Sequence, residues 1–155
     1  MLGKRLVIVL GMGLAVLGLA GCGSPDLDTP EGVVHAFFDR LDDKDQDGVR
    51  ALLCQDFKQN VNLEMGRDRD VDYSFDLRYR AADERDAPAV DVAVYGKMEM
   101  HLRARHVRYE VHERRDSEAP WTVRVASING EWLVCGGDPQ VLRLLDARGT
   151  LDALE

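Results

Sequence analysis

This chain of 155 residues has few cysteines, no long uninterrupted apolar run and no internal repeat or low-complexity tract. Its main apolar stretch lies near the amino terminus and is broken by glycines, and a membrane-spanning helix needs roughly 20 apolar residues. The sequence also contains neither a Gly-x-Ser-x-Gly nucleophile elbow nor a phosphate-cradling glycine loop. These absences argue against a spanning helix, a repeat architecture and two common kinds of enzyme chemistry.

Positive charge is scarce as well. The chain has 20 Lys and Arg residues against 28 Asp and Glu residues, so its formal net charge is -8. An acidic surface repels phosphate groups, which argues against nucleic acid or an anionic lipid surface as the partner.

The first residues have the layout of a secretory signal. Lys4 and Arg5 form a positive segment, residues 6–18 are apolar, and small residues then precede Cys22. We predict a signal peptide over residues 1–21, a flexible tether over residues 22–28 and one domain over residues 29–155. Removal of the signal would change the formal charge from -8 to -10, because 18 basic and 28 acidic side chains remain.

The four residues Leu19-Ala20-Gly21-Cys22 resemble the lipobox of bacterial lipoproteins. This resemblance implies that the Cys22 thiol receives a diacylglyceryl group, and that the signal is cut before this residue. Two or three acyl chains, at about 0.8 kcal/mol per buried methylene, make a durable anchor. We therefore expect an exported protein held by lipid at the outer face of the cell membrane. An ordinary signal peptide with a chance cysteine is the alternative.

Two cysteines remain after Cys22, namely Cys54 and Cys135. Thiols of exported domains pair in an oxidising compartment, so we predict a Cys54–Cys135 disulfide. Closing the loop between residues 54 and 135 would stabilise the fold by roughly 4 to 5 kcal/mol, because the bond lowers the entropy of the unfolded chain. Two buried free thiols are the alternative.

Helical periodicity marks both ends of the domain. Thr29 is placed to cap a helix that begins at Pro30, and a second, shorter helix is predicted through Val49, Leu52, Leu53 and Phe57. Asp138 is placed to cap a last helix that begins at Pro139, and Gly149 would end it.

Between these helices the period changes from 3.6 to 2, which is typical of half-buried strands. Alternating apolar residues run from Val71 to Tyr79 and again from Val90 onward. Their parity switches from even to odd around Arg105, which predicts a bulge or a sharp bend there. Asn129-Gly130 predicts a tight hairpin turn between the last two strands.

Helices followed by an antiparallel sheet predict an α+β domain. The helical stretch from Thr29 to Phe57, the alternating strands and the closing "INGEWLVC" resemble the nuclear transport factor 2-like, or cystatin-like, superfamily, and in particular small actinobacterial lipoproteins of unassigned role. The resemblance implies N-terminal helices packed on a curved antiparallel sheet that forms a cone, and a disulfide between Cys54 and Cys135. A helix after Cys135 departs from that pattern.

The stretch Asp43-Lys44-Asp45-Gln46-Asp47-Gly48 begins like a calcium-binding EF-hand loop. Position 12 of such a loop requires a bidentate glutamate, and here it is Cys54. We therefore interpret this stretch as a turn between two helices, with Asp45 or Asp47 as the N-cap of the second.

The four histidines do not have the spacing of a metal site. His101 and His106 have opposite parity on a strand, and His106 and His112 would lie about 20 Å apart. His35 is interpreted as a partly buried core residue. We predict no metal and no cofactor.

Some members of the cone-fold superfamily are isomerases, cyclases or dehydratases that use interior acid and base groups. The resemblance directs attention to Tyr79, Asp91 and His106 as possible pocket residues, although each also suits the surface of a strand. No residue is predicted to be catalytic.

The sequence therefore favours a lipid-anchored, extracytoplasmic binding or interaction module that lacks catalytic activity. Its expected partner is an unknown protein or a small apolar ligand, and a homodimer is a further possibility. Trp132 and Leu133 alternate on the last strand, so one of them is expected to face away from the core. A small enzyme acting on an apolar substrate, and an inhibitor or accessory factor of a cell-envelope enzyme, are the two alternatives.

Overall fold

The structure is a computed structural model that describes residues 25–63, 71–82, 87–103, 106–115 and 117–154. Within these ranges, helices precede and follow a five-stranded antiparallel sheet, so the predicted α+β class is confirmed. None of the helices described is both long and apolar enough to cross a membrane. The predicted signal peptide and Cys22 lie outside the described residues.

The first helix, α1 (Pro30–Asp42), begins where the sequence predicts. The hydroxyl of Thr29 accepts a hydrogen bond from the backbone N–H of Gly32 at 3.1 Å, and Pro30 needs no hydrogen-bond acceptor at the first helical position. This cap directs the apolar face of α1, which includes Phe37 and Phe38, toward the sheet.

The prediction of a single second helix is wrong, because the chain forms α2 (Gln46–Ala51) and α3 (Gln55–Asn60) instead. Between them the backbone pairs with the last strand. The N–H of Cys54 donates to the carbonyl of Val134 at 2.9 Å, and the N–H of Val134 donates to the carbonyl of Leu52 at 2.8 Å. These bonds satisfy groups on the edge of the sheet that would otherwise lack partners, which favours breaking the helix.

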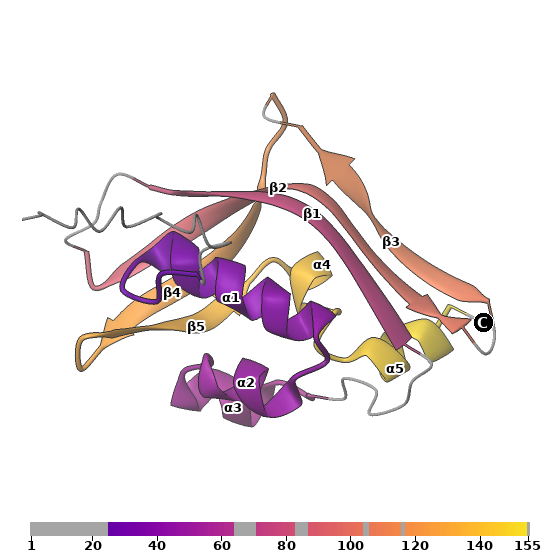
Figure 1. The fold of residues 1–155 in the computed structure, drawn as a ribbon, viewed down its shortest axis with the longest axis horizontal. Coiled ribbons are helices and arrows are strands. Elements are labelled where there is room, and N and C mark those ends of the chain that lie inside the picture. The colour runs from indigo at the N-terminus through magenta and orange to yellow at the C-terminus, as the bar shows by residue number, and fades with distance from the viewer. Residues whose placement is uncertain (1–24, 64–70, 83–86, 104–105, 116, 155) are drawn as a thin grey trace, which may run out of the picture.

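The longest strand, β2, organises the sheet. The strands are β1 (Val71–Ala81), β2 (Ala89–Leu102), β3 (Val107–Arg114), β4 (Trp121–Ile128) and β5 (Glu131–Gly137). One side of β2 pairs with β1, whereas its other side pairs with β4 over the first half and with β3 over the second half. Among the strands that the structure describes, β5 pairs with β4 alone. In Figure 1, β1 and β2 arch over α1.

The switch of parity in the sequence is explained by a reversal of the chain. Met100 on β2 is paired with Tyr109 on β3, so an even and an odd position face the same side of two antiparallel strands. Arg105, where a bulge or bend was expected, lies outside the described residues. The Asn129-Gly130 turn is confirmed: both residues have positive φ, 57° and 86°, as a type I′ hairpin requires.

The core fills the space between α1 and the inner face of the sheet. The largest side chains with less than 2 % exposure include both aromatic and aliphatic residues: Trp121, Phe37, Phe38, Leu41, Leu53, Met98, Met100, Leu144 and Leu145. Their spacing explains the change of period in the sequence, since the buried positions recur every three or four residues on α1 and every second residue on the strands.

The predicted C-terminal helix is interrupted, and forms α4 (Pro139–Leu142) and α5 (Ala147–Asp152). Asp138 caps the first, as predicted, by accepting from the N–H of Gln140 at 3.0 Å. The carboxylate of Asp146 accepts from the N–H of Gly149 at 3.0 Å and so begins a new helical turn. The Asp146 side chain therefore competes with the backbone hydrogen bonds that would continue α4.

Candidate binding surface

A surface hollow of about 320 Å³ lies between the start of the described chain, the helices and the β4–β5 hairpin. We call it the tether-side hollow. Its lining residues come from four separate segments: Leu27, Asp28, Arg40, Ala51, Leu52, Gly130, Glu131, Trp132 and Leu133. This volume is near the lower limit of small-molecule pockets in proteins.

The wall of the tether-side hollow is largely apolar. Leu27 is 44 % exposed, Leu52 is buried, and Trp132 and Leu133 are both half-buried. The lining carries both signs of charge, because it includes Arg40 as well as Asp28 and Glu131. Apolar side chains that remain in contact with water gain free energy, about 25 cal/mol per Å², when a partner covers them.

The hairpin turn and the Leu52–Cys54 bridge position two walls of this hollow. The turn at Asn129-Gly130 sets the register that brings Glu131 opposite Ile128 and Trp132 opposite Ser127. The sequence predicted that Trp132 or Leu133 would face away from the core, and in the structure both are partly accessible. Contributions from residues 27, 28, 51 and 52 were not predicted, because no pattern in the sequence links them to the hairpin.

Cys54 and Cys135 lie beside one another behind these walls. Both are free thiols in the structure; Cys54 is buried and Cys135 is half-buried. Burial, followed by a side-chain hydrogen bond with Cys54, raises the pKa of Cys135 to about 12. The Cys135 thiol also lies 3.6 Å from the carbonyl oxygen of Leu133. The disulfide remains a prediction, and the two side chains lie close enough for a hydrogen bond.

The structure does not bring Tyr79, Asp91 and His106 together. Tyr79 on β1 is paired with Val94 and faces inward, whereas Asp91 on β2 is exposed on the outer face. Asp91 accepts two hydrogen bonds from Arg124, at 2.8 and 2.7 Å, which hold the pKa of the Asp91 carboxyl below its usual value. His106 is exposed, with a φ of 57°, in the connection between β2 and β3.

A different polar cluster surrounds Tyr79. The imidazole Nε2 of His35 lies 3.5 Å from Oδ1 of Asp39, one helical turn later, and its ring centroid lies 5.3 Å from that of Tyr79. His35 is exposed, so the interpretation of it as a partly buried core residue is wrong. The i, i+4 spacing on α1 was the available signal. Burial, and then Asp39, raises the pKa of Tyr79, so this phenol stays protonated at neutral pH and can donate a hydrogen bond.

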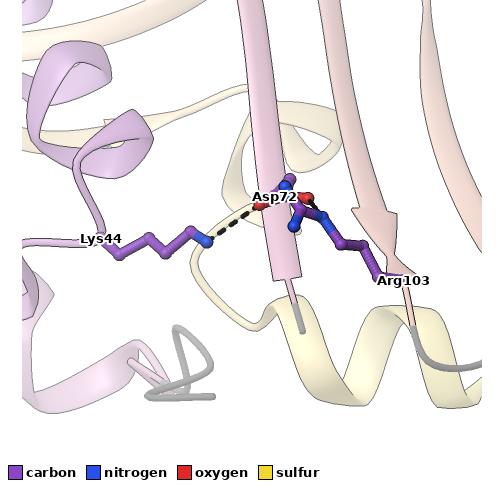
Figure 2. Close-up of polar contacts among 3 residues, drawn as sticks. All are labelled: Lys44, Asp72 and Arg103. Atoms are coloured by element: carbon purple, nitrogen blue, oxygen red, sulfur yellow. Dashed lines mark hydrogen bonds and ion pairs between the residues drawn. The ribbon is translucent and has the colours of Figure 1, made fainter. Parts of the chain in front are cut away.

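The acidic loop after α1 is a turn that is tied to the sheet. Asp45 caps α2 by accepting from the N–H of Gly48 at 2.9 Å, as the sequence predicted. Lys44 has a φ of 59° and donates to Asp72 at 3.0 Å, and Asp72 also accepts from Arg103 (Figure 2). The hydrogen bond from Lys44, together with the one from Arg103, lowers the pKa of the Asp72 carboxyl.

Among the described residues, no group of three or more His, Cys, Asp or Glu side chains is arranged to hold a metal ion. The aspartates of the loop are instead engaged in capping α2 or exposed. Compared with known proteins, the chain matches no family model, no curated protein and no solved structure.

Proposed function

We propose that this protein is a lipid-anchored, extracytoplasmic binding module with a cone-shaped, cystatin-like domain. Its tether-side hollow would receive an apolar group from a small ligand or from a partner in the cell envelope. The observation that carries the proposal is the position of this hollow, because Leu27 in its wall is five residues from the predicted lipidation site at Cys22.

Covalent geometry limits the distance between the lipid and the hollow. Five residues span at most about 18 Å when fully extended, so Leu27 would stay within that distance of the lipidated sulfur. A binding surface at this place would face molecules at or near the membrane. The half-buried Trp132 suits such a surface, since tryptophan combines a large apolar ring with a polar N–H group.

The packing inside the sheet supports binding at the surface. Phe37, Phe38 and Trp121 fill the space between α1 and the sheet, each at 1 % exposure. An enzyme that used the interior of a cone would need that space for its substrate. The protein's own side chains occupy it, so we assign ligand binding to the tether-side hollow.

Site-directed photocrosslinking in the native envelope tests this proposal. A photoreactive phenylalanine analogue is placed at Leu133 in the hollow and, in a control, at Thr122, which is exposed on β4 and does not line the hollow. The proposal expects an adduct from the Leu133 position, seen on a gel for a protein or by intact mass for a small molecule. Equal adducts from both positions, or none from Leu133, would contradict it.

A further inference from the structure

The outer edge of β3 is an open strand edge. β3 pairs with β2 on one side, and no described strand pairs with its other side; in Figure 1 it borders the sheet. In an antiparallel strand, alternate residues direct both their N–H and their C=O groups to the same side. About half of the residues from Val107 to Arg114 therefore present hydrogen-bonding groups to whatever lies next to this edge.

The charges on β3 are self-complementary. Arg108 and Glu110 are on the outer face of the sheet, and their side chains are 59 % and 45 % exposed. An antiparallel pairing of β3 with β3 of a second copy, centred on Tyr109, places Arg108 of each copy opposite Glu110 of the other. The pairing is symmetric, so one arrangement provides two opposite-charge pairs.

Other registers are less favourable. A shift by two residues in either direction places Arg108 opposite Arg108, or Glu110 opposite Glu110. Like charges directly across two strands are destabilising. A shift by one residue would reverse the faces of one copy and place Tyr109 on the charged outer side of the other. Among registers within two residues of this one, the charge pattern therefore favours the pairing centred on Tyr109.

Within one copy, Glu110 lies near both a glutamate and a lysine. Glu110 is paired with another glutamate, Glu99 on β2, and its carboxylate lies 3.8 Å from the amine of Lys97. The Nη1 atom of Arg108 lies 3.4 Å from Oε1 of Glu99. In the proposed dimer, Arg108 of the second copy would lie opposite Glu110.

The inner side of the same edge offers one aromatic ring, beside a hollow whose lining is mixed and includes Arg143 and Asp146. Tyr109 is half-buried and lines a hollow of about 350 Å³ together with residues that include Leu154, which is 52 % exposed. In the register centred on Tyr109, the two tyrosines meet at the two-fold axis beside this surface. Cross-strand aromatic pairs stabilise antiparallel sheets.

We infer that β3 is a self-association edge, through which two copies of this chain form a symmetric dimer with a continuous antiparallel sheet. This goes beyond the proposed binding function, since none of the described residues that line the tether-side hollow belongs to β3. Lipid anchoring would favour the dimer by confining both copies to one membrane surface and raising their effective concentration.

Charge exchange between two full-length copies tests the inference. Two C-terminally tagged forms are expressed together and solubilised in mild detergent; one is captured and the other is quantified. The wild-type forms should be captured together. Two copies of R108E, or two of E110R, should lose about tenfold in capture, because both cross-strand pairs become repulsive. R108E mixed with E110R should recover capture, since both pairs are again of opposite sign, and so should the double variant R108E/E110R.

An untagged measurement adds a second readout. Tyr109→Cys places two thiols opposite each other at the proposed axis, within the range of Cα separations that a disulfide spans. Non-reducing electrophoresis of envelope fractions should show a covalent dimer for Tyr109→Cys and none for Thr122→Cys. The inference is overturned if the two variants form equal amounts of dimer, if wild-type copies are not captured together, or if the mixed charge variants fail to recover.

Discussion

The two faces of the sheet use the same strands for different purposes. On β4, Trp121 is 1 % exposed on the inner face and contacts the core, whereas the next residue, Thr122, is exposed on the outer face. On β2, the same alternation separates buried Val92 from Asp91, which is held by Arg124. The inner face thus carries most of the stability, because burial of apolar area outweighs exposed ion pairs. The proposed binding surfaces lie instead at the tether-side hollow and at the edge of β3.

Backbone hydrogen bonds join the Leu52–Cys54 segment to the sheet at Val134, and the predicted disulfide between Cys54 and Cys135 gives the largest expected effect. With a disulfide, thiol labelling of the denatured, unreduced protein should find neither cysteine free. Cys54→Ala should then lower the free energy of unfolding by roughly 4 to 5 kcal/mol, because the loop closed in the unfolded chain is long. Chemical denaturation measures this difference. Labelling of both thiols in protein from the envelope would contradict the predicted disulfide.

Neighbouring residues on β4 compare the two faces directly. Trp121→Ala should cost about 3 to 5 kcal/mol of unfolding free energy, since it leaves a large cavity in the core. Thr122→Ala, the matched control, should change it by less than about 0.5 kcal/mol. Denaturant titration of both variants provides the measurement. Similar losses of unfolding free energy for the two variants would contradict the claim that the inner face carries most of the stability.

A smaller effect is expected at the turn that joins α1 to α2. Asp45→Ala removes the carboxylate that accepts from the N–H of Gly48, and should lower the unfolding free energy by about 1 kcal/mol. Asp47→Ala, in the first turn of the same helix, should cost only a few tenths of a kcal/mol. Equal losses would mean that Asp45 acts through charge and not as a cap.

The smallest effect concerns the ion pairs of Asp72. Its folded pKa is lowered, chiefly by Lys44, so its contribution to stability is present above the unfolded pKa near 3.8 and is lost as the pH falls through the folded value. Asp72→Asn should therefore lower the melting temperature slightly at pH 7, and this difference should disappear toward pH 2. Ser74→Ala serves as the control on the same strand. A difference that is independent of pH would contradict the electrostatic explanation.

The sequence predicted the elements whose patterns are local. Thr29 and Pro30 marked the start of α1, alternating residues marked β1, and Asn129-Gly130 marked the last hairpin. It did not predict the break at Leu52–Cys54, because that break is stabilised by hydrogen bonds to Val134, 80 residues later along the chain. The tether-side hollow was not predicted for the same reason, because its lining residues come from segments that are far apart in the sequence.

The predicted pocket residues show what a sequence pattern does not determine about side chains. Period-2 spacing placed Asp91 and Tyr79 on strands correctly, but it did not show that the two strands pair so that these residues face opposite sides. Register depends on contacts between distant segments, and a shift by one residue reverses every side chain. Candidate sites that combine residues from several strands therefore require the structure.

Intact mass spectrometry of the full-length gene product, isolated from the envelope of its native host, tests the central claim most directly. The account predicts a chain that begins at Cys22 and carries the added mass of a diacylglyceryl group. A chain that retains residues 1–21, or one with an unmodified thiol at Cys22, would contradict it.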